Sequence, residues 1–391
     1  MVSVNLFSLR DSQRHAFVKR QYANLYTMSS LVSYEPSVED CIALFSRRLS
    51  GFCREGKPVD LGRWLQFYAF DVIGAITFSK RFGFMEHGRD VGDIISTIDY
   101  TFFNTTIGGY FLWALPLLFA LTPKTGTKAL DEFTSAAIQE RVQTTEKELG
   151  EDGPQDFMDK LFKVADKNPQ ENRLSLITGA AAANIGAGSD TTGITLTAIL
   201  FNILQNPGVL QKLRDELDTA LATGQISDPI TFTESQGLPY LQAVFKESMR
   251  MHPATGLPMW RVVPPEGVVL CDRYFPGGAV VGTNTWVAHY NCDVYGKDVE
   301  DFRPERWIDN DKETLDSMNR YFMPFGLGAR TCIGKNISLL EIGKLVPQLV
   351  QKFDFQLLDS SKPRLESRNV WFVKQHGFNV LVTERKGAQG K

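Results

Sequence analysis

Cysteine is scarce and scattered in this chain. The five cysteines are Cys41, Cys53, Cys271, Cys292 and Cys332. No two of them form a Cys-x-x-Cys pair, and no Cys/His group has the spacing of zinc ligands. The sequence therefore indicates neither a structural zinc site nor a disulfide framework. We expect a reducing compartment, in which a functional thiol stays free.

An excess of charge of one sign is also missing. Lys and Arg number 42 against 45 Asp and Glu, for a net charge of −3, so no basic field indicates nucleic acid binding. The first residues lack the basic start and apolar run of a signal peptide. The most apolar stretch, residues 107–121, is shorter than the roughly 18–20 residues that span a bilayer. We interpret it as a buried or lid segment, with a dip into the membrane surface as the alternative.

Complete nucleotide-binding and metal-binding patterns are absent as well. Gly186-x-Gly188 and Gly326-x-Gly328 lack the third glycine and the strand–turn–helix context of a dinucleotide site. Four histidines have no metal-ligand spacing and are interpreted as structural or surface residues: His87, His252, His289 and His376. The sequence has no internal repeat, low-complexity tract or convincing linker.

Helical periodicity dominates the first two thirds of the chain. It predicts helices over the ranges 14–25, 38–49, 61–77, 130–149, 173–205 and 338–353. After Pro264, short apolar runs between Pro, Gly and Asp predict strands at 268–270, 279–281 and 378–382. The sequence thus predicts a mainly α fold with a smaller β portion, as a single domain over residues 1–391.

The loop at 325–334 has the pattern Phe-x-x-Gly-x-Arg-x-Cys-x-Gly, set by Phe325, Gly328, Arg330, Cys332 and Gly334. A thiolate that binds haem iron needs a loop whose backbone approaches the porphyrin, and glycines remove the side chains that would block it. Arg330 offers a fixed cation to a haem propionate. The alternative is an ordinary small thiol after a glycine-rich turn. The loop resembles the haem-binding loop of the cytochrome P450 family, which implies Cys332 as the axial iron ligand.

The long helix predicted at 173–205 carries Ala187-Gly188-Ser189-Asp190-Thr191-Thr192. Ala187 and Thr191 lie four residues apart on one face, where a small residue leaves room for a planar cofactor. A mid-helix hydroxyl can bond the carbonyl four residues back and loosen the helix for ordered water. The segment resembles the family's oxygen-activation motif, which implies that Asp190 and Thr191 deliver protons. The alternative is that small residues merely permit close helix packing.

Glu247 and Arg250 lie three residues apart on one helix, close enough to pair. An apolar stripe flanks them, so the pair is expected to be partly buried rather than a solvated surface contact. They resemble the family's Glu-x-x-Arg helix, and Arg306 lies in a Pro-Glu-Arg segment similar to the family's. The resemblance implies that all three form a structural charge network.

Further residues are carried over from the resemblance alone. Arg261 occupies the position of a propionate-binding arginine, with an ordinary surface arginine as the alternative. His15 and Lys19 stand where the family has a Trp-x-x-x-Arg pair, and lysine lacks the planar fork of arginine. The residues expected to line a substrate pocket are Phe103, Gly188, Ala254, Thr255, Leu257 and Pro258.

The resemblance extends over nearly the whole chain and is strongest to filamentous-fungal members of specialised metabolism. It implies a haem-dependent monooxygenase that holds haem b (iron protoporphyrin IX) and inserts one atom of O2 into a C–H bond of a hydrophobic small molecule. Electrons would come from NADPH through a separate flavoprotein, cytochrome P450 reductase. The protein would be a monomer.

The N-terminus departs from the family pattern. The membrane anchor, first helix and initial strands are not found before His15, so we interpret the single domain as N-terminally incomplete. The expected location is the membrane surface of the endoplasmic reticulum by resemblance, or the cytoplasm because the anchor is absent. The alternatives are a haem-thiolate isomerase or dehydratase that does not oxygenate, and a truncated haem-binding or non-catalytic remnant.

Overall fold

The computed structural model describes residues 6–7, 9–121, 125–145, 157–167 and 173–386. The longer helices are α1 Ser12–Tyr22, α3 Glu35–Glu55, α4 Leu61–Phe78, α6 Ile94–Tyr110, α8 Thr125–Thr145, α9 Phe157–Asp166, α10 Arg173–Gln205, α11 Pro207–Ala222, α13 Pro239–Met251, α16 Lys312–Tyr321 and α17 Lys335–Lys352. The short ones are α2 Met28–Leu31, α5 Phe84–His87, α7 Leu115–Ala120, α12 Phe232–Gln236, α14 Thr285–His289 and α15 Cys292–Tyr295. The 3-10 turns are η1 Ala23–Tyr26, η2 Val32–Tyr34, η3 Val91–Asp93, η4 Leu112–Ala114, η5 Pro304–Trp307 and η6 Gly328–Arg330.

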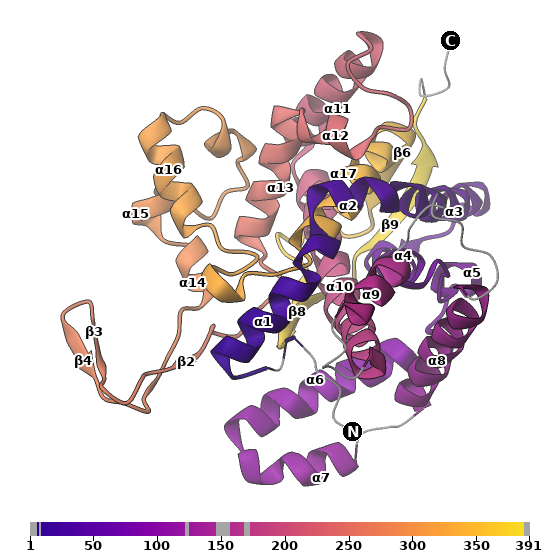
Figure 1. The fold of residues 1–391 in the computed structure, drawn as a ribbon. Helices are drawn as coiled ribbons and strands as arrows, with labels where there is room; N and C mark the ends of the chain where they lie inside the picture. Colours follow the sequence, from indigo (N-terminus) through magenta and orange to yellow (C-terminus); the bar gives the residue numbers. More distant parts are fainter. Residues whose placement is uncertain (1–5, 8, 122–124, 146–156, 168–172, 387–391) are drawn as a thin grey trace.

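The β structure is split into small antiparallel units. The strands are β1 Val59–Asp60, β2 Arg261–Val262, β3 Val268–Leu270, β4 Arg273–Phe275, β5 Val280–Val281, β6 Phe353–Leu357, β7 Glu366–Val370, β8 Phe372–His376 and β9 Asn379–Glu384. One sheet has the order β1-β9-β6, and the pairs β2–β5, β3–β4 and β7–β8 stand apart from it. The β3–β4 hairpin projects from the body of the molecule (Figure 1).

The core forms around α10, which packs along α4 and also contacts α13 and α17 (Figure 1). Residues 67–78 of α4 are all buried, and this run is apolar apart from Asp71 and Thr77. Asp60 caps its first turn by accepting from Arg63 N at 3.1 Å, and Ser79 ends it in the left-handed conformation. A helix of this kind gives α10 a fixed surface to lie on.

The predicted fold class is confirmed, since helices dominate and the sheets are small. The 173–205 helix has the predicted bounds, and the strand at 268–270 is β3. The helix expected at 130–149 is α8 as far as residue 145, and residues 146–149 lie outside the described ranges. Strands β6 to β8 were missed because their runs are mostly polar or follow a helix directly.

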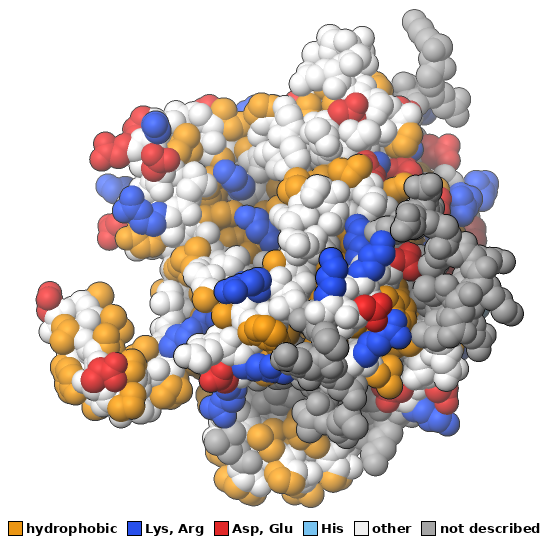
Figure 2. All heavy atoms as spheres, viewed as in Figure 1, with side chains coloured by type: hydrophobic (Ala, Val, Ile, Leu, Met, Phe, Trp, Pro, Cys, Tyr) orange, Lys and Arg blue, Asp and Glu red, His pale blue; other side chains and the backbone are white. Residues whose placement is uncertain are grey.

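The segment at 107–121 was expected to be buried or to form a lid, and burial is wrong, whereas the lid and the dip into the membrane surface stay predictions. Tyr110, Trp113 and Leu117 are exposed, with 81% of Trp113 accessible. Figure 2 shows apolar side chains gathered over the α6–α7 edge and on the projecting β3–β4 hairpin. Within the described ranges, no single helix is both long and apolar enough to cross a membrane. Helices α10 and α11 together have the length and composition to cross a membrane, but a bend of 106° separates them.

Candidate functional site

Cys332 lies between η6 and α17 in a tightly turned loop. Its N–H donates to Phe325 O at 2.9 Å, which closes the loop at its base. Gly326 and Gly328 have φ values of 70° and 69°, a left-handed conformation that other residues rarely adopt. A side chain on Gly334 would begin 4.0 Å from Cys332 Sγ, whereas Gly328 faces open space. The loop therefore presents an accessible thiol beside bare backbone.

The surroundings of the Cys332 sulfur have opposing effects on the pKa of its thiol. Crowding by protein atoms raises the pKa of Cys332, and the backbone N–H groups of Gly334 and Lys335 oppose this by donating to the sulfur. The charges of Lys19 and Lys335 also lower that pKa. Fixed N–H donors of this kind are suited to a sulfur that carries negative charge.

Basic side chains gather beside the loop. Lys19 Nζ donates to Ala329 O at 2.8 Å and Thr331 O at 3.0 Å. Arg330 extends toward the N-terminal segment, and its Nη1 donates to Leu9 O at 2.7 Å. His15 is buried; burial lowers its pKa, and the charges of Arg330 and Lys19 lower it further.

Arg261 takes no part in this cluster in the contacts observed. Its side chain is exposed and donates from Nη1 to Trp260 O at 2.7 Å. Among the described residues no carboxylate pairs with Lys19, Arg330 or Arg261. These cations are therefore available to an anionic group, and His15 lies with the first two.

The centre of α10 is tied to the cysteine loop by hydrogen bonds. Tyr26 donates from its hydroxyl to Asn184 Oδ1 at 2.6 Å, and Asn336 on α17 donates to Tyr26 O at 2.9 Å. Thr192 and Ser338 hydroxyls meet at 3.0 Å, again joining α10 to α17. Helix α17 begins directly after the cysteine loop, so these bonds fix the loop relative to α10.

The predicted oxygen-activation segment has the expected local geometry. Thr191 Oγ1 donates to Ala187 O at 2.7 Å, the bond four residues back that loosens a helix. Ala187 is exposed in a helix that is otherwise largely buried, so a small open face exists at this level. Gly188 faces the other way, because a side chain there would meet Ile73 of α4 at 3.3 Å.

Asp190 is 1% exposed and faces α4 and β8. Its Oδ1 accepts from Gln66 Nε2 at 2.7 Å, and its Oδ2 lies 3.0 Å from Lys374 Nζ. Lys374 also pairs with Asp99 of α6. Burial raises the pKa of Asp99, and the two carboxylates raise that of Lys374 against the effect of its own burial.

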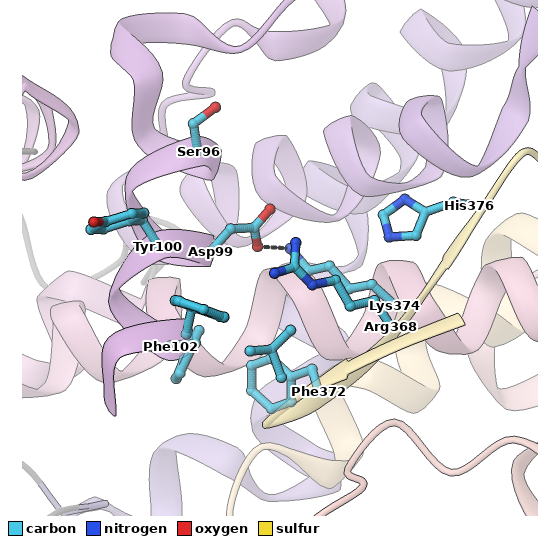
Figure 3. Close-up of a pocket in the computed structure, with 10 residues that line it drawn as sticks. Ser96, Asp99, Tyr100, Phe102, Arg368, Phe372, Lys374 and His376 are labelled. Carbon is cyan, nitrogen blue, oxygen red and sulfur yellow. Dashed lines mark hydrogen bonds and ion pairs between the residues drawn. The ribbon is translucent and has the colours of Figure 1, made fainter. Parts of the chain in front are cut away.

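A cavity of about 390 Å³ opens between α6 and the β7–β8 hairpin (Figure 3). Its lining residues are Ser96, Asp99, Tyr100, Phe102, Phe103, Arg368, Val370, Phe372, Lys374 and His376. Phe103 was predicted to line a substrate pocket, and the Arg368 guanidinium lies 5.3 Å from the centre of its ring. Figure 3 shows Lys374 and Asp99 reaching toward each other across the cavity.

The predicted pocket segment 254–258 runs beside this cavity. Val373 N donates to Ala254 O at 2.9 Å, and Thr255 forms a β-bridge with Phe372. Leu257 and Pro258 follow, half-buried, and lead to Met259. At Gly326 a side chain would meet Met259 Sδ at 3.5 Å, so the segment extends from the cavity to the cysteine loop.

Glu247, Arg250 and Arg306 are buried together. Glu247 Oε1 accepts from Arg250 Nη2 at 2.8 Å and Arg306 Nε at 3.3 Å, and Oε2 accepts from Trp307 Nε1 at 2.9 Å. Asp298 pairs with Arg306 Nη1 at 2.8 Å, and its pKa falls to about 2, chiefly through that bond. The structure therefore brings the three residues together in one buried network, in which both oxygens of Glu247 accept hydrogen bonds.

The residues fit an iron porphyrin better than a bare metal ion. Among the described residues, no group of three or more His, Cys, Asp or Glu could hold an ion directly. A single thiol is enough when a porphyrin supplies nitrogen ligands to the iron. Bare backbone at Gly328 and Gly334, the open face at Ala187, and cations that no described carboxylate pairs with match a flat, dianionic cofactor.

A mainly helical domain with an accessible thiol loop anchored to a long helix defines the class of haem-thiolate proteins. The sequence profile described as Cytochrome P450 matches residues 6–382. A cytochrome P450 monooxygenase of Aspergillus terreus is 39% identical, covering 90% of this chain and 73% of its own. Pisatin demethylase of Fusarium vanettenii is 39% identical, covering 98% and 75%, and a cytochrome P450 monooxygenase of Emericella nidulans is 38% identical, covering 98% and 77%. The chain belongs to the cytochrome P450 family and is an oxygen-incorporating oxidoreductase.

Sequence reasoning missed the partners of Asp190. Gln66 lies in an apolar helix and Lys374 in a short strand, and neither position belongs to a motif. Tyr26 was likewise not singled out as a link to α10. A polar residue at the edge of a buried apolar run, as Gln66 is, was an available signal, because such a residue needs a partner.

Proposed function

We propose that this chain inserts one atom of O2 into a C–H bond of a hydrophobic small molecule, in fungal secondary metabolism. The observation that carries the proposal is the accessible Cys332 thiol on a loop anchored to α10 at Asn184 and Thr192. The similarity to fungal cytochrome P450 monooxygenases, at 32–39% identity, supports a role in fungal secondary metabolism. The aromatic cavity wall of Tyr100, Phe102 and Phe103 supports an apolar substrate. We assign this activity to a single domain.

The residues around the loop would hold haem b. Cys332 would ligate the iron, Gly328 and Gly334 would let the ring approach the backbone, and Lys19 and Arg330 with His15 would face the propionates. Bound there, the haem would supply reductive activation of dioxygen, with electrons from NADPH through a separate flavoprotein reductase.

The protein's own part in the mechanism is to place protons and exclude water. Thr191 keeps its hydroxyl on the helix by donating to Ala187 O, where it can order a water molecule. The carboxylate of Asp190, the preceding residue, is buried against α4 and β8. The aromatic side chains of α6 and Phe372 cover the approach, so a bound apolar molecule would displace solvent from the cavity.

We also propose contact with the surface of the endoplasmic reticulum membrane. The exposed aromatic and aliphatic side chains of α6, η4 and α7 support it, because such a patch is costly to leave in water. Tyr110 packs edge-on against Trp260 at 6.1 Å between ring centres, which continues the patch toward β2.

The proposed function is tested by the reduced, carbon-monoxide-bound difference spectrum of the purified chain. A strongly red-shifted Soret band is expected for the wild type, and Cys332→Ala should lose it while keeping its helical content. Retention of the red-shifted band in Cys332→Ala would remove Cys332 as the ligand. Absence of haem in the wild type would leave the chain without the chemistry proposed.

A further inference from the structure

A short series of charged side chains leads from the cavity into α10. Lys374 on β8 lies between Asp99 of α6 and Asp190 of α10, and Gln66 of α4 meets Asp190 from the other side. The side chain of Asp99 is 48% exposed, that of Lys374 18% and that of Asp190 1%. The series therefore links a carboxylate in contact with solvent to one that solvent scarcely reaches.

The two oxygens of Asp190 are held unequally. Oδ1 accepts a hydrogen bond from Gln66, whereas the contact found at Oδ2 among the described residues is with the Lys374 ammonium, 3.0 Å away. A buried carboxylate that loses its cation takes up a proton or turns toward water. Lys374 therefore fixes the direction of the Asp190 carboxylate.

The backbone around this contact has little freedom to adjust. A side chain on Gly193 of α10 would begin 3.0 Å from Gln66 Cα, so α10 and α4 approach as closely as glycine permits. On the other side, Gln375 beside Lys374 donates to Ile194 O at 3.2 Å and holds β8 against α10. Strand β8 is thus held in place against α10, and this keeps the Lys374 ammonium beside Asp190.

We propose that Lys374 is a positioning residue for Asp190, and that protons enter the relay from the cavity between α6 and the β7–β8 hairpin. The inference rests on the proposed function and adds a residue and an entry side to it. The Asp190 carboxylate accepts a proton that solvent supplies through water in the cavity and passes it toward Thr191, which restores the negative charge of Asp190. Lys374 keeps its own proton, and Asp99 orients it from the opposite wall.

The test uses the haem-loaded protein with NADPH and a cytochrome P450 reductase, without substrate. Released superoxide needs one electron and no proton per O2, whereas hydrogen peroxide needs two electrons and two protons. Lys374→Met should raise the ratio of superoxide to peroxide, and by less than the roughly hundredfold that marks the low end for loss of a positioned proton donor, because Lys374 acts through Asp190. Asp190→Asn should do the same, and the double variant should add little. An unchanged ratio in Lys374→Met, or an additive rise in the double variant, overturns the inference.

Lys344 on α17 offers a matched control. It is also a buried lysine between two carboxylates, with Nζ 3.0 Å from Glu35 Oε1 and 2.8 Å from Glu39 Oε2 and a side chain 3% exposed. Lys344→Met removes an equivalent ion-pair arrangement away from the proposed relay. The ratio of superoxide to peroxide in Lys344→Met should stay at the wild-type value. A rise equal to that of Lys374→Met would assign the effect to general loosening of the fold.

A second readout does not depend on turnover. The urea midpoints of Lys374→Met, Asp190→Asn and their double variant should be non-additive, because the residues share one contact. Additive shifts would contradict the contact. Lys374→Arg, which keeps the charge, should restore most of the wild-type ratio. If Lys374→Met does not fold, Asp99→Asn at the exposed end carries the test, with a smaller rise expected and no rise refuting the entry side.

Failure of the proposed function has a different signature. The wild type would then lack the red-shifted carbon monoxide band, or would consume no O2 with NADPH and reductase. A normal band, normal wild-type consumption and an effect of Asp190→Asn without one of Lys374→Met would reject the role of Lys374 alone.

Discussion

Glu247 and Asp190 are both buried carboxylates that meet a cation from a distant part of the chain, Arg306 and Lys374 respectively, yet their surroundings differ. Glu247 is wholly inaccessible, and both of its oxygens accept hydrogen bonds from arginine or tryptophan donors. Asp190 has one hydrogen-bonded oxygen and one held only by an ion pair, and its lysine borders a cavity.

The difference separates a carboxylate that supports the fold from one with capacity left for chemistry. A fully satisfied network gains from every member and fails when one is removed. An oxygen with a single ionic contact keeps a lone pair free for a proton. The comparison predicts that stability depends most on Glu247 and that proton transfer depends on Asp190.

The largest expected effect is that of Glu247→Gln. It leaves Arg250 and Arg306 buried without their shared anion, which should cost about 3–5 kcal/mol of unfolding free energy. Urea unfolding and haem content of the purified variant measure it. The control is Glu300→Gln, which breaks the exposed pair with Arg364 and should cost less than about 1 kcal/mol. Equal costs for the two variants would refute the buried-network interpretation.

Asp190→Asn should destabilise less, by about 1–3 kcal/mol, because Lys374 keeps Asp99 as a partner. The amide keeps the size of the side chain and can still accept from Gln66. The same urea titration measures the loss. A cost as large as that of Glu247→Gln would erase the distinction between the two carboxylates.

Asp298 gives the buried network a pH signature. Its folded pKa of about 2 lies below the ordinary value of 3.8, chiefly because Arg306 donates to it. The resulting stability is present above about pH 4 and is lost as the pH falls toward 2. The stability of wild type should therefore decline in this window more steeply than that of Asp298→Asn. Parallel acid-unfolding curves would contradict this assignment.

Thr191→Ala should have the smallest effect on stability, within about 0.5 kcal/mol, because it removes only a bond to a carbonyl of its own helix. Its effect should instead appear as uncoupling, with more peroxide released per NADPH while the carbon monoxide spectrum is unchanged. Thr195→Ala is the control, since Thr195 makes the same type of bond to Thr191 O one turn further on. Equal uncoupling in both variants would remove Thr191 from the relay.

The sequence predicted the helical core because periodicity and motif spacing are local properties. The bounds of α10, the Thr191–Ala187 bond and the pairing of Glu247 with Arg250 follow from such local patterns. Arg306 was added to that pair by the family resemblance alone. The partners of Asp190 could not be predicted, because they depend on how β8 and α4 meet α10 in space. The exposed segment at 107–121 was misjudged for a related reason, since apolar composition does not say whether another element covers it.

Gly256 limits how this protein can be altered. A side chain there would begin 2.3 Å from Asn369 Nδ2, where the 254–258 segment meets the β7–β8 turn. Tyr100, Phe102 and Phe103 on the facing wall are exposed or half-buried and have no such restriction. Evolution or engineering of a new substrate preference should therefore proceed more readily through the α6 wall, since a side chain at Gly256 would first have to displace the amide of Asn369.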